Sequence, residues 1–232
     1  MDLSALIARF RTLSGDHGVP ALWPDAEVTA FLNEAEREAA ERARLLYDKT
    51  TPAVVEIDLL PDVREYRLHP KIFDVEAIGL QRPGGDRRWP VCRADEGDMR
   101  WSVSRRPNLS GWAGFFFVYG DTDGTGTEGK HLVLDRKPQE AGGKLLLEVY
   151  RYPLTDLVDP DDEPEIGPRH HDALVHWALH VAYQTRDMEG SASARAQHHE
   201  VEFAKRFGLR DDANVVRKKV RHRAPVVRPQ RF

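Results

Sequence analysis

The stretch from His171 to Gly208, HDALVHWALHVAYQTRDMEGSASARAQHHEVEFAKRFG, decides the fold of this chain. Its first part is apolar around almost the whole helix circumference. The thin polar stripe that remains consists of Asp172, His176, His180 and Gln184 at i, i+4 spacing. A helix with so little polar surface is buried against other helices or a partner, and we expect Trp177 to be buried with it. The second part is amphipathic and ends at Gly208, a preferred helix-ending residue, with Leu209 placed to pack back on the last turn.

Two more helices are expected near the N-terminus. Residues 2–13 place their leucines, Ile7 and Phe10 on one side, and residues 25–47 repeat apolar side chains at steps of three and four. Several of the latter are alanines, which leave room for close approach of another helix. Pro24 suits a helix start, because a proline in the first turn loses no hydrogen bond.

From residue 51 to about residue 152 the pattern changes to short β-branched or aromatic runs. Turn segments such as PDV, RPGGD and EAGG separate them, which predicts antiparallel strands and hairpins. The runs are VVEIDLL, EYRLH, IFDVEAIGL, RWPVC, FFFVY, HLVLD and KLLLEVYRY. An acidic, proline-rich connector then leads back to helical sequence, with Pro168 just inside the expected helix start.

The sequence therefore predicts an α+β fold. Residues 1–50 and 160–208 are expected to form a helical bundle, and residues 51–159 a β-rich insertion. Residues 209–232 lose periodicity and contain two prolines, so we expect an extended basic C-terminal arm.

Charge is distributed unevenly along the chain. Charged residues make up 31% of the 232 residues and hydrophobic residues 41%, with a net charge of −4, so a core is possible and the total charge favours no partner class. Residues 156–165 are strongly acidic. The arm carries basic residues and no acid from residue 213 onward, namely Arg217, Lys218, Lys219, Arg221, Arg223, Arg228 and Arg231. Two oppositely charged segments suit head-to-tail contact between copies.

The compartment is indicated by what the sequence lacks. Cys92 is the single cysteine, so no internal disulfide forms, which fits a reducing cytosol. The N-terminus is too short and too charged for a signal peptide, and no apolar run is long enough to cross a membrane. We expect a protein made in such a reducing compartment.

Two loop motifs overlap in one glycine-rich segment. Residues 124–129 (GTGTEG) match GxGxxG, but a strand-like run follows, whereas a dinucleotide-binding loop opens a helix. Residues 121–126 copy part of an EF-hand calcium loop, but Leu132 stands where a bidentate glutamate is required. We therefore expect a hairpin turn, with no cofactor and no calcium.

No catalytic set is visible. His176 and His180 have the spacing of a helical zinc site, but Trp177 occupies the place of the catalytic glutamate, so packed histidines are preferred to a metalloenzyme. Cys92 lies in a strand-like run, which favours a half-buried structural thiol. No serine lies in a GxSxG elbow. The prediction is that the chain is not an enzyme.

The basic arm has two interpretations that are compatible with each other. It can strap onto a protein partner, because its prolines limit the entropy lost on docking. It can alternatively hold DNA phosphates, in which case binding should weaken steeply with salt. Protein contact is preferred, because the arm lacks regularly interleaved aromatic residues for stacking on single strands.

Three stretches of the chain carry a resemblance to a known family. They are residues 22–48 with the step Asn33-Glu34-Ala35, residues 144–157 with Pro153, and residues 170–208, which end in Phe-Gly. In this order they resemble the opening helix, the last strand with its exit proline, and the closing helical pair of the head–tail adaptor (connector) proteins of tailed phages, especially short-tailed ones.

The resemblance implies a structural virion protein in the neck between head and tail. Such a protein forms a ring, usually of twelve copies, that docks on the portal protein and holds tail or nozzle proteins. The genome passes through its lumen without sequence-specific binding. In that family the C-terminal arm commonly engages the portal, which here corresponds to residues 209–232. The resemblance also implies no catalysis.

Overall fold

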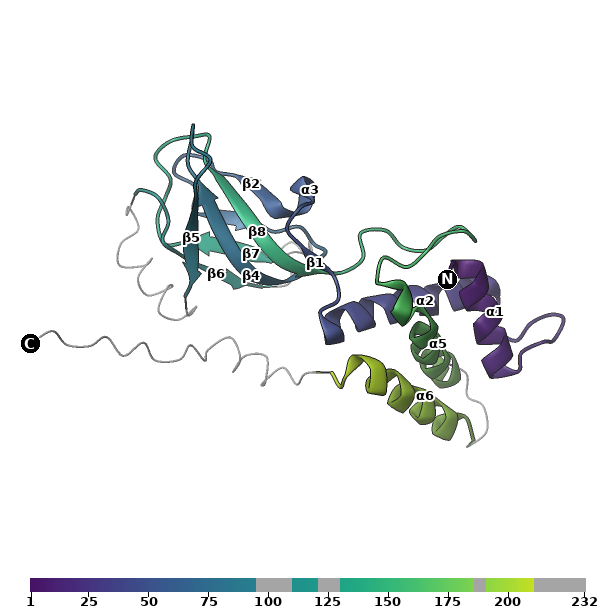
Figure 1. Cartoon of the computed structure of the whole chain (residues 1–232). Helices are drawn as coiled ribbons and strands as arrows, with labels where there is room; N and C mark the ends of the chain where they lie inside the picture. Colours follow the sequence, from purple (N-terminus) through teal and green to yellow (C-terminus); the bar gives the residue numbers. More distant parts are fainter. Residues whose placement is uncertain (95–109, 121–129, 186–190, 211–232) are drawn as a thin grey trace, which may run out of the picture.

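The computed structural model describes residues 1–94, 110–120, 130–185 and 191–210, which form a helical bundle beside a curled β-sheet (Figure 1). The helices are α1 (Leu3–Ser14), α2 (Asp25–Ala43), α3 (Pro52–Val55), the 3-10 helix η1 (Pro168–His170), α5 (His171–Thr185) and α6 (Ser191–Phe207). The strands are β1 (Tyr47–Asp48), β2 (Glu56–Asp58), β3 (Glu65–Arg67), β4 (Ile72–Gln81), β5 (Arg88–Arg93), β6 (Phe115–Tyr119), β7 (His131–Leu134) and β8 (Lys144–Arg151). The predicted α+β fold class is confirmed.

The N-terminal helix begins and ends with local signals. The Asp2 carboxylate accepts a hydrogen bond from the Ala5 N–H at 2.8 Å, which satisfies one of the unpaired donors of the first turn. Gly15 ends the helix with φ 71°, in the left-handed region that glycine adopts without strain. Helix α1 therefore agrees with the helix expected over residues 2–13.

Helix α2 ends four residues earlier than the predicted limit at Tyr47. Arg44 takes a left-handed conformation with φ 49°, and its N–H still bonds to the Ala40 carbonyl. Tyr47 and Asp48 then pair with Tyr150 and Val149 of strand β8. Backbone pairing with a strand about a hundred residues away overrides the helical spacing of the side chains, which a local pattern cannot reveal.

The sheet runs in the order β1-β8-β4-β5-β6-β7-β3, with β2 also paired to β8. All pairs of named strands in the described part of the chain are antiparallel, as expected, except β5 and β6. These two are parallel, with Cys92 opposite Phe115 and Arg93 opposite Phe116. Val54 and Val55, at the start of the predicted first strand, belong instead to helix α3, which has Pro52 in its first turn. Their N–H groups bond to the Thr51 carbonyl.

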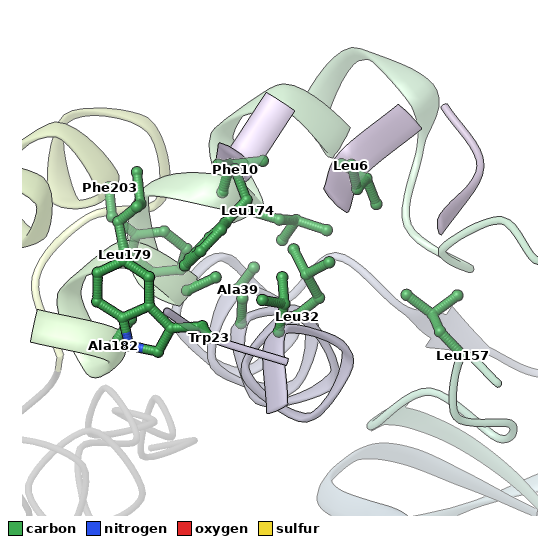
Figure 2. Packing of buried hydrophobic residues seen from close by; sticks show 14 of the residues in the cluster. Leu6, Phe10, Trp23, Leu32, Ala39, Leu157, Leu174, Leu179, Ala182 and Phe203 are labelled. Atoms are coloured by element: carbon green, nitrogen blue, oxygen red, sulfur yellow. The ribbon is translucent and has the colours of Figure 1, made fainter. Parts of the chain in front are cut away.

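The helices and the sheet enclose separate hydrophobic clusters. The helical cluster is made by α1, α2, α5 and α6, and its side chains converge from both ends of the sequence (Figure 2). Its largest buried members are Trp23, Phe10 and Phe203, and the Trp23 ring meets Phe10 and Tyr183 edge-on. The sheet cluster is lined by alternate residues of β4 and β8, such as Ile78, Leu80, Leu145 and Leu147.

The connector from β8 to α5 lies along helix α2. Asn33 holds it by two hydrogen bonds to Leu157, accepting from the N–H at 2.7 Å and donating to the carbonyl at 3.0 Å. Glu36 accepts the Ile166 N–H at 3.2 Å. The connector is therefore a fixed part of the bundle. No helix within the described ranges is long and apolar enough to span a membrane.

Candidate interaction surfaces

The predicted polar stripe of α5 does not act as one surface. Asp172 is exposed and accepts from Arg9 of α1 at 3.0 Å. His176 Nδ1 lies 3.0 Å from His199 Nδ1 of α6, and the buried His180 places Nδ1 2.9 Å from the Ala196 carbonyl oxygen. The stripe is therefore divided between a surface ion pair and the α5–α6 seam, because α6 packs across its middle.

The two histidines at zinc-site spacing do not converge on a common point. His176 and His180 each have a different partner on α6, and the described residues hold no cluster of three or more histidine, cysteine, aspartate or glutamate side chains that suits a metal ion. Burial lowers the pKa of His199 to about 4 and also lowers the pKa of His176. The His176–His199 pair is therefore neutral near pH 7, which suits packing between helices.

Trp177 is half-buried rather than buried, so that prediction was wrong. Its ring lies 5.1 Å from the Phe203 ring, and the Arg42 guanidinium covers it at 4.7 Å. Its Nε1 donates to Glu34 at 3.1 Å. The indole fills the corner between α2, α5 and α6 with one edge toward solvent, and the Arg42 side chain of α2 covers its face.

The arm starts from the end of α6, beside α2. Gly208 has φ 85°, and its N–H bonds to the Ala204 carbonyl at 2.8 Å, so the predicted helix end is confirmed. Leu209 is 81% exposed and does not pack on the last turn, contrary to the prediction. Arg42 holds the Gly208 carbonyl at 3.3 Å. The seven basic arm residues, Arg217, Lys218, Lys219, Arg221, Arg223, Arg228 and Arg231, lie outside the described residues.

The acidic connector forms a defined surface at the start of α1. Asp162 accepts the N–H groups of Val158 and Asp159, both at 2.8 Å, and so closes a tight turn. Its carbonyl accepts the Leu3 N–H at 2.8 Å, which ties the turn to the helix. Asp159, Asp161 and Glu163 remain exposed beside Val158, which is 75% exposed. The surface therefore has a charge opposite to that of the arm.

A buried charge network joins the sheet to the bundle. Arg151 donates to Asp48 at 2.7 Å and to both carboxylate oxygens of Glu165. Burial alone would raise the pKa of Asp48, but hydrogen bonds from the Thr50 and Thr51 N–H groups and from Arg151 hold it well below its usual range. The ionised network fixes the connector to the end of β8. Its role is structural, since all three groups are used by one another.

A groove separates the two ends of the curled sheet. Residues 53–54 and 56–57 line one side, and residues 67–70 line the other. Within the described residues, β2 pairs only with β8 and β3 only with β7, so the sheet stays open along this seam. The walls combine the apolar side chains of Val54, Ile57 and Leu68 with Glu56.

One charged surface was not predicted from the sequence. At the β4–β5 turn, Arg82 and Arg87 stack on Trp89 with their guanidinium carbons 4.9 and 4.0 Å from the ring centre. Arg82 also lies 5.9 Å from the Trp112 ring. The segment RPGGDRRW contains three arginines and a tryptophan within eight residues, and this density was the available signal.

Two further predictions concern the sheet. Cys92 is exposed, not half-buried, because Val91 takes the inward position of β5 and its neighbour points outward. Strands β6 and β7 pair antiparallel with Tyr119 opposite His131, as the hairpin interpretation of the glycine-rich segment requires. The segment itself, residues 121–129, lies outside the described residues.

The chain matches the sequence model of a known protein family over almost its whole length. A search of curated proteins found none similar to this chain. The sequence model described as SU10 adaptor protein matches residues 1–229. That match covers both cores, the connector and nearly all of the basic arm, so it concerns the whole architecture and not one module. The chain therefore belongs to the SU10 adaptor protein family.

Proposed function

We propose that this protein is a structural head–tail adaptor of a phage, located in the neck of the virion. The observation that carries the proposal is the family match over residues 1–229, which supports a head–tail adaptor role. A structural role also agrees with the side-chain chemistry. The Arg151–Asp48 ion pair joins separate elements, and the His176–His199 contact packs α5 on α6. An adaptor needs such rigid joints and no reactive centre.

The proposed assembly is a ring of identical copies around a channel for the genome. We propose twelve copies, the usual number in the adaptor family that the sequence resembles. Support for contact between copies comes from charge. The acidic connector surface around Asp159, Asp161 and Glu163 is held rigid against α1, and the arm that leaves α6 is basic. A rigid surface of one sign and a segment of the other sign on the same chain favour head-to-tail association, which closes into a ring when the rotation permits.

The basic arm is the proposed contact with the portal, and the outer rim of the ring is the proposed contact with tail or nozzle proteins. The residues assigned to portal contact are Arg217, Lys218, Lys219, Arg221, Arg223, Arg228 and Arg231. Support comes from the point where the arm begins, at the end of α6. Gly208 ends α6, and Leu209 is exposed and does not pack back on the last turn.

Electron microscopy of the purified protein, alone and mixed with its portal protein, tests this function. The expected result is a ring stacked on the portal. A protein ending at Arg210 should keep the fold and lose docking, while a Lys49→Glu, Arg195→Glu protein serves as a charge-changed control that docks. A strictly monomeric protein that ignores the portal contradicts the proposal.

The division of the chain into units is also proposed. Residues 1–50 and 160–208 form one helical unit, residues 51–159 an inserted β unit, and residues 209–232 the arm. The two separate hydrophobic clusters support this division. So does the pairing of Tyr47 with Tyr150, which brings entry and exit of the insertion side by side.

A further inference from the structure

At the β4–β5 turn, two arginine side chains stack on one tryptophan ring. Arg82 follows β4 and Arg87 precedes β5, and both guanidinium groups lie within 5 Å of the Trp89 ring centre. Stacking on an aromatic face leaves the N–H edges of a guanidinium available, because the ring contacts its plane. The two groups therefore present donors outward from a common base.

The aromatic base is held by the sheet. Trp89 is opposite Leu80 in the β4–β5 register and packs on the sheet cluster, as Trp112 does. Gly143 lies directly under Trp112, and a Cβ at that position would come within 2.7 Å of its ring. No side chain fits there without moving the indole. Packing thus fixes the positions of the two rings, and stacking on them restricts the positions of the arginine side chains.

The charge of this surface is not neutralised within the described structure. Neither Arg82 nor Arg87 forms an ion pair among the described residues, although Asp86 lies between them in the loop. The next arginine, Arg88, lies 3.9 Å from Glu148. Holding two cations over one ring is unfavourable in isolation, and an external anion relieves that repulsion.

The position of the turn separates it from the surfaces described above. The register of β4 runs from Ile72, opposite Arg151 at the joint with the bundle, to Gln81, opposite Lys144 at the other end. The Arg82–Arg87 turn therefore lies at the end of the sheet away from the helical bundle (Figure 1). It is also distant in sequence from the arm. The chain has a second basic surface, independent of residues 211–232.

We propose that Arg82 and Arg87 bind the phosphate backbone of duplex DNA. Guanidinium groups match phosphate oxygens by paired hydrogen bonds, and backbone contacts carry no base sequence information. A protein interface needs an apolar centre, but none of the large exposed hydrophobic side chains falls in residues 81–89. The proposal rests on the adaptor function, in which the genome passes through the ring, and it directs this end of the sheet toward the DNA.

The test measures binding of the full-length protein to a duplex of about 30 base pairs by fluorescence anisotropy, between about 50 and 200 mM salt. The test variant is Arg82→Glu, Arg87→Glu. The matched control is Lys49→Glu, Arg195→Glu, which changes net charge equally at two exposed cations away from the turn. We expect the test variant to lose about tenfold or more in affinity and about two units of salt slope, and the control to lose little.

A second variant separates binding from folding. Arg82→Lys, Arg87→Lys keeps both charges, so it should retain most of the affinity, and all variants should melt near the wild-type temperature. Equal affinity of the test variant and the control overturns the proposal. Unchanged DNA affinity combined with lost capture of a tail protein assigns the surface to a protein partner instead.

The adaptor function is judged by a different readout. DNA affinity is measured without the portal, whereas ring formation and portal docking are seen by electron microscopy. Docking of the Arg82→Glu, Arg87→Glu protein with unchanged DNA binding refutes the DNA surface alone. Failure of the wild-type protein to dock refutes the adaptor role alone.

Discussion

Arg151 donates a hydrogen bond to Asp48 at 2.7 Å, and this buried pair joins the entrance of the β insertion to its exit. The two residues are 103 positions apart, and their side chains are only 9% and 3% exposed. Glu165 completes the network from the connector. One arginine thus links the last strand, the first strand and the chain segment that leads into α5.

Asp48→Ala is expected to destabilise the fold by about 3–5 kcal/mol, because it leaves the Arg151 charge with one partner fewer in a buried site. It also removes the acceptor of the Thr50 and Thr51 N–H groups. Urea denaturation followed by circular dichroism measures the change. Arg37→Ala is the control, since its pair with Asp156 is about half exposed and should contribute less than about 1 kcal/mol. Equal losses from both substitutions would contradict the structural role of the pair.

Glu36→Gln is expected to stabilise the protein at pH 8 and to have little effect at pH 5. Burial raises the pKa of Glu36 from 4.5 to about 7, so the folded state binds a proton that the unfolded state releases, and stability falls as pH rises from 4.5 to 7. Glutamine keeps an acceptor for the Ile166 N–H and carries no charge. The gain at pH 8 should reach up to about 3 kcal/mol. Denaturation curves at both pH values check it, and a loss of stability at pH 8 would contradict the raised pKa of Glu36.

The His176–His199 contact predicts the opposite dependence of stability on pH from that of Glu36. Burial lowers the pKa of His199 from 6.5 to about 4, and the nearby His176, His198 and His180 act in the same direction, against Glu202. The unfolded state therefore binds more protons, and this stabilisation is lost as pH falls below 6.5. In His199→Gln the drop in melting temperature between pH 6.5 and pH 4 should be smaller than in wild type. A drop as large as that of wild type would show that the pair does not titrate.

Two tryptophans of the bundle should contribute differently to the free energy of unfolding. Trp23 is 2% exposed, so Trp23→Ala is expected to cost about 3–5 kcal/mol. Trp177 keeps an edge in solvent and is covered by Arg42, so Trp177→Ala should cost about 1–3 kcal/mol. Chemical denaturation of the two variants gives the comparison. The reverse order of the two losses would contradict the burial described for them.

Replacing residues 49–150 by a short glycine linker should leave a folded helical protein. Tyr47 and Tyr150 are partners across the β1–β8 pair, so a few residues bridge the gap, and Asp48 and Arg151 both remain. The expected result is a cooperative thermal transition with a helical circular dichroism spectrum. Non-cooperative melting would show that the helices need the β insertion, and would refute the proposed division into units.

Sequence predicted the elements where side chains repeat on one face. The α5–α6 pair, α1 and most strands follow from periodicity, and Gly208 from the conformational freedom of glycine. It did not predict the end of α2 or the parallel β5–β6 pair, since both depend on distant partners. Of the surfaces, the charge of the arm and of the connector was evident in the sequence, whereas the Arg82–Trp89 stack required knowledge of which rings the sheet places under the turn.

The sequence by itself determined the class of fold, the order of helices and strands, and the opposite charges of the connector and arm, because these follow from local pattern and composition. Only the tertiary structure decided how the residues are used. It divided the polar stripe of α5 between a surface ion pair and the helix seam, left Trp177 and Cys92 partly or fully exposed, and joined Asp48 to Arg151. The physical reason is that burial and pairing depend on neighbours supplied by remote parts of the chain, which periodicity does not encode.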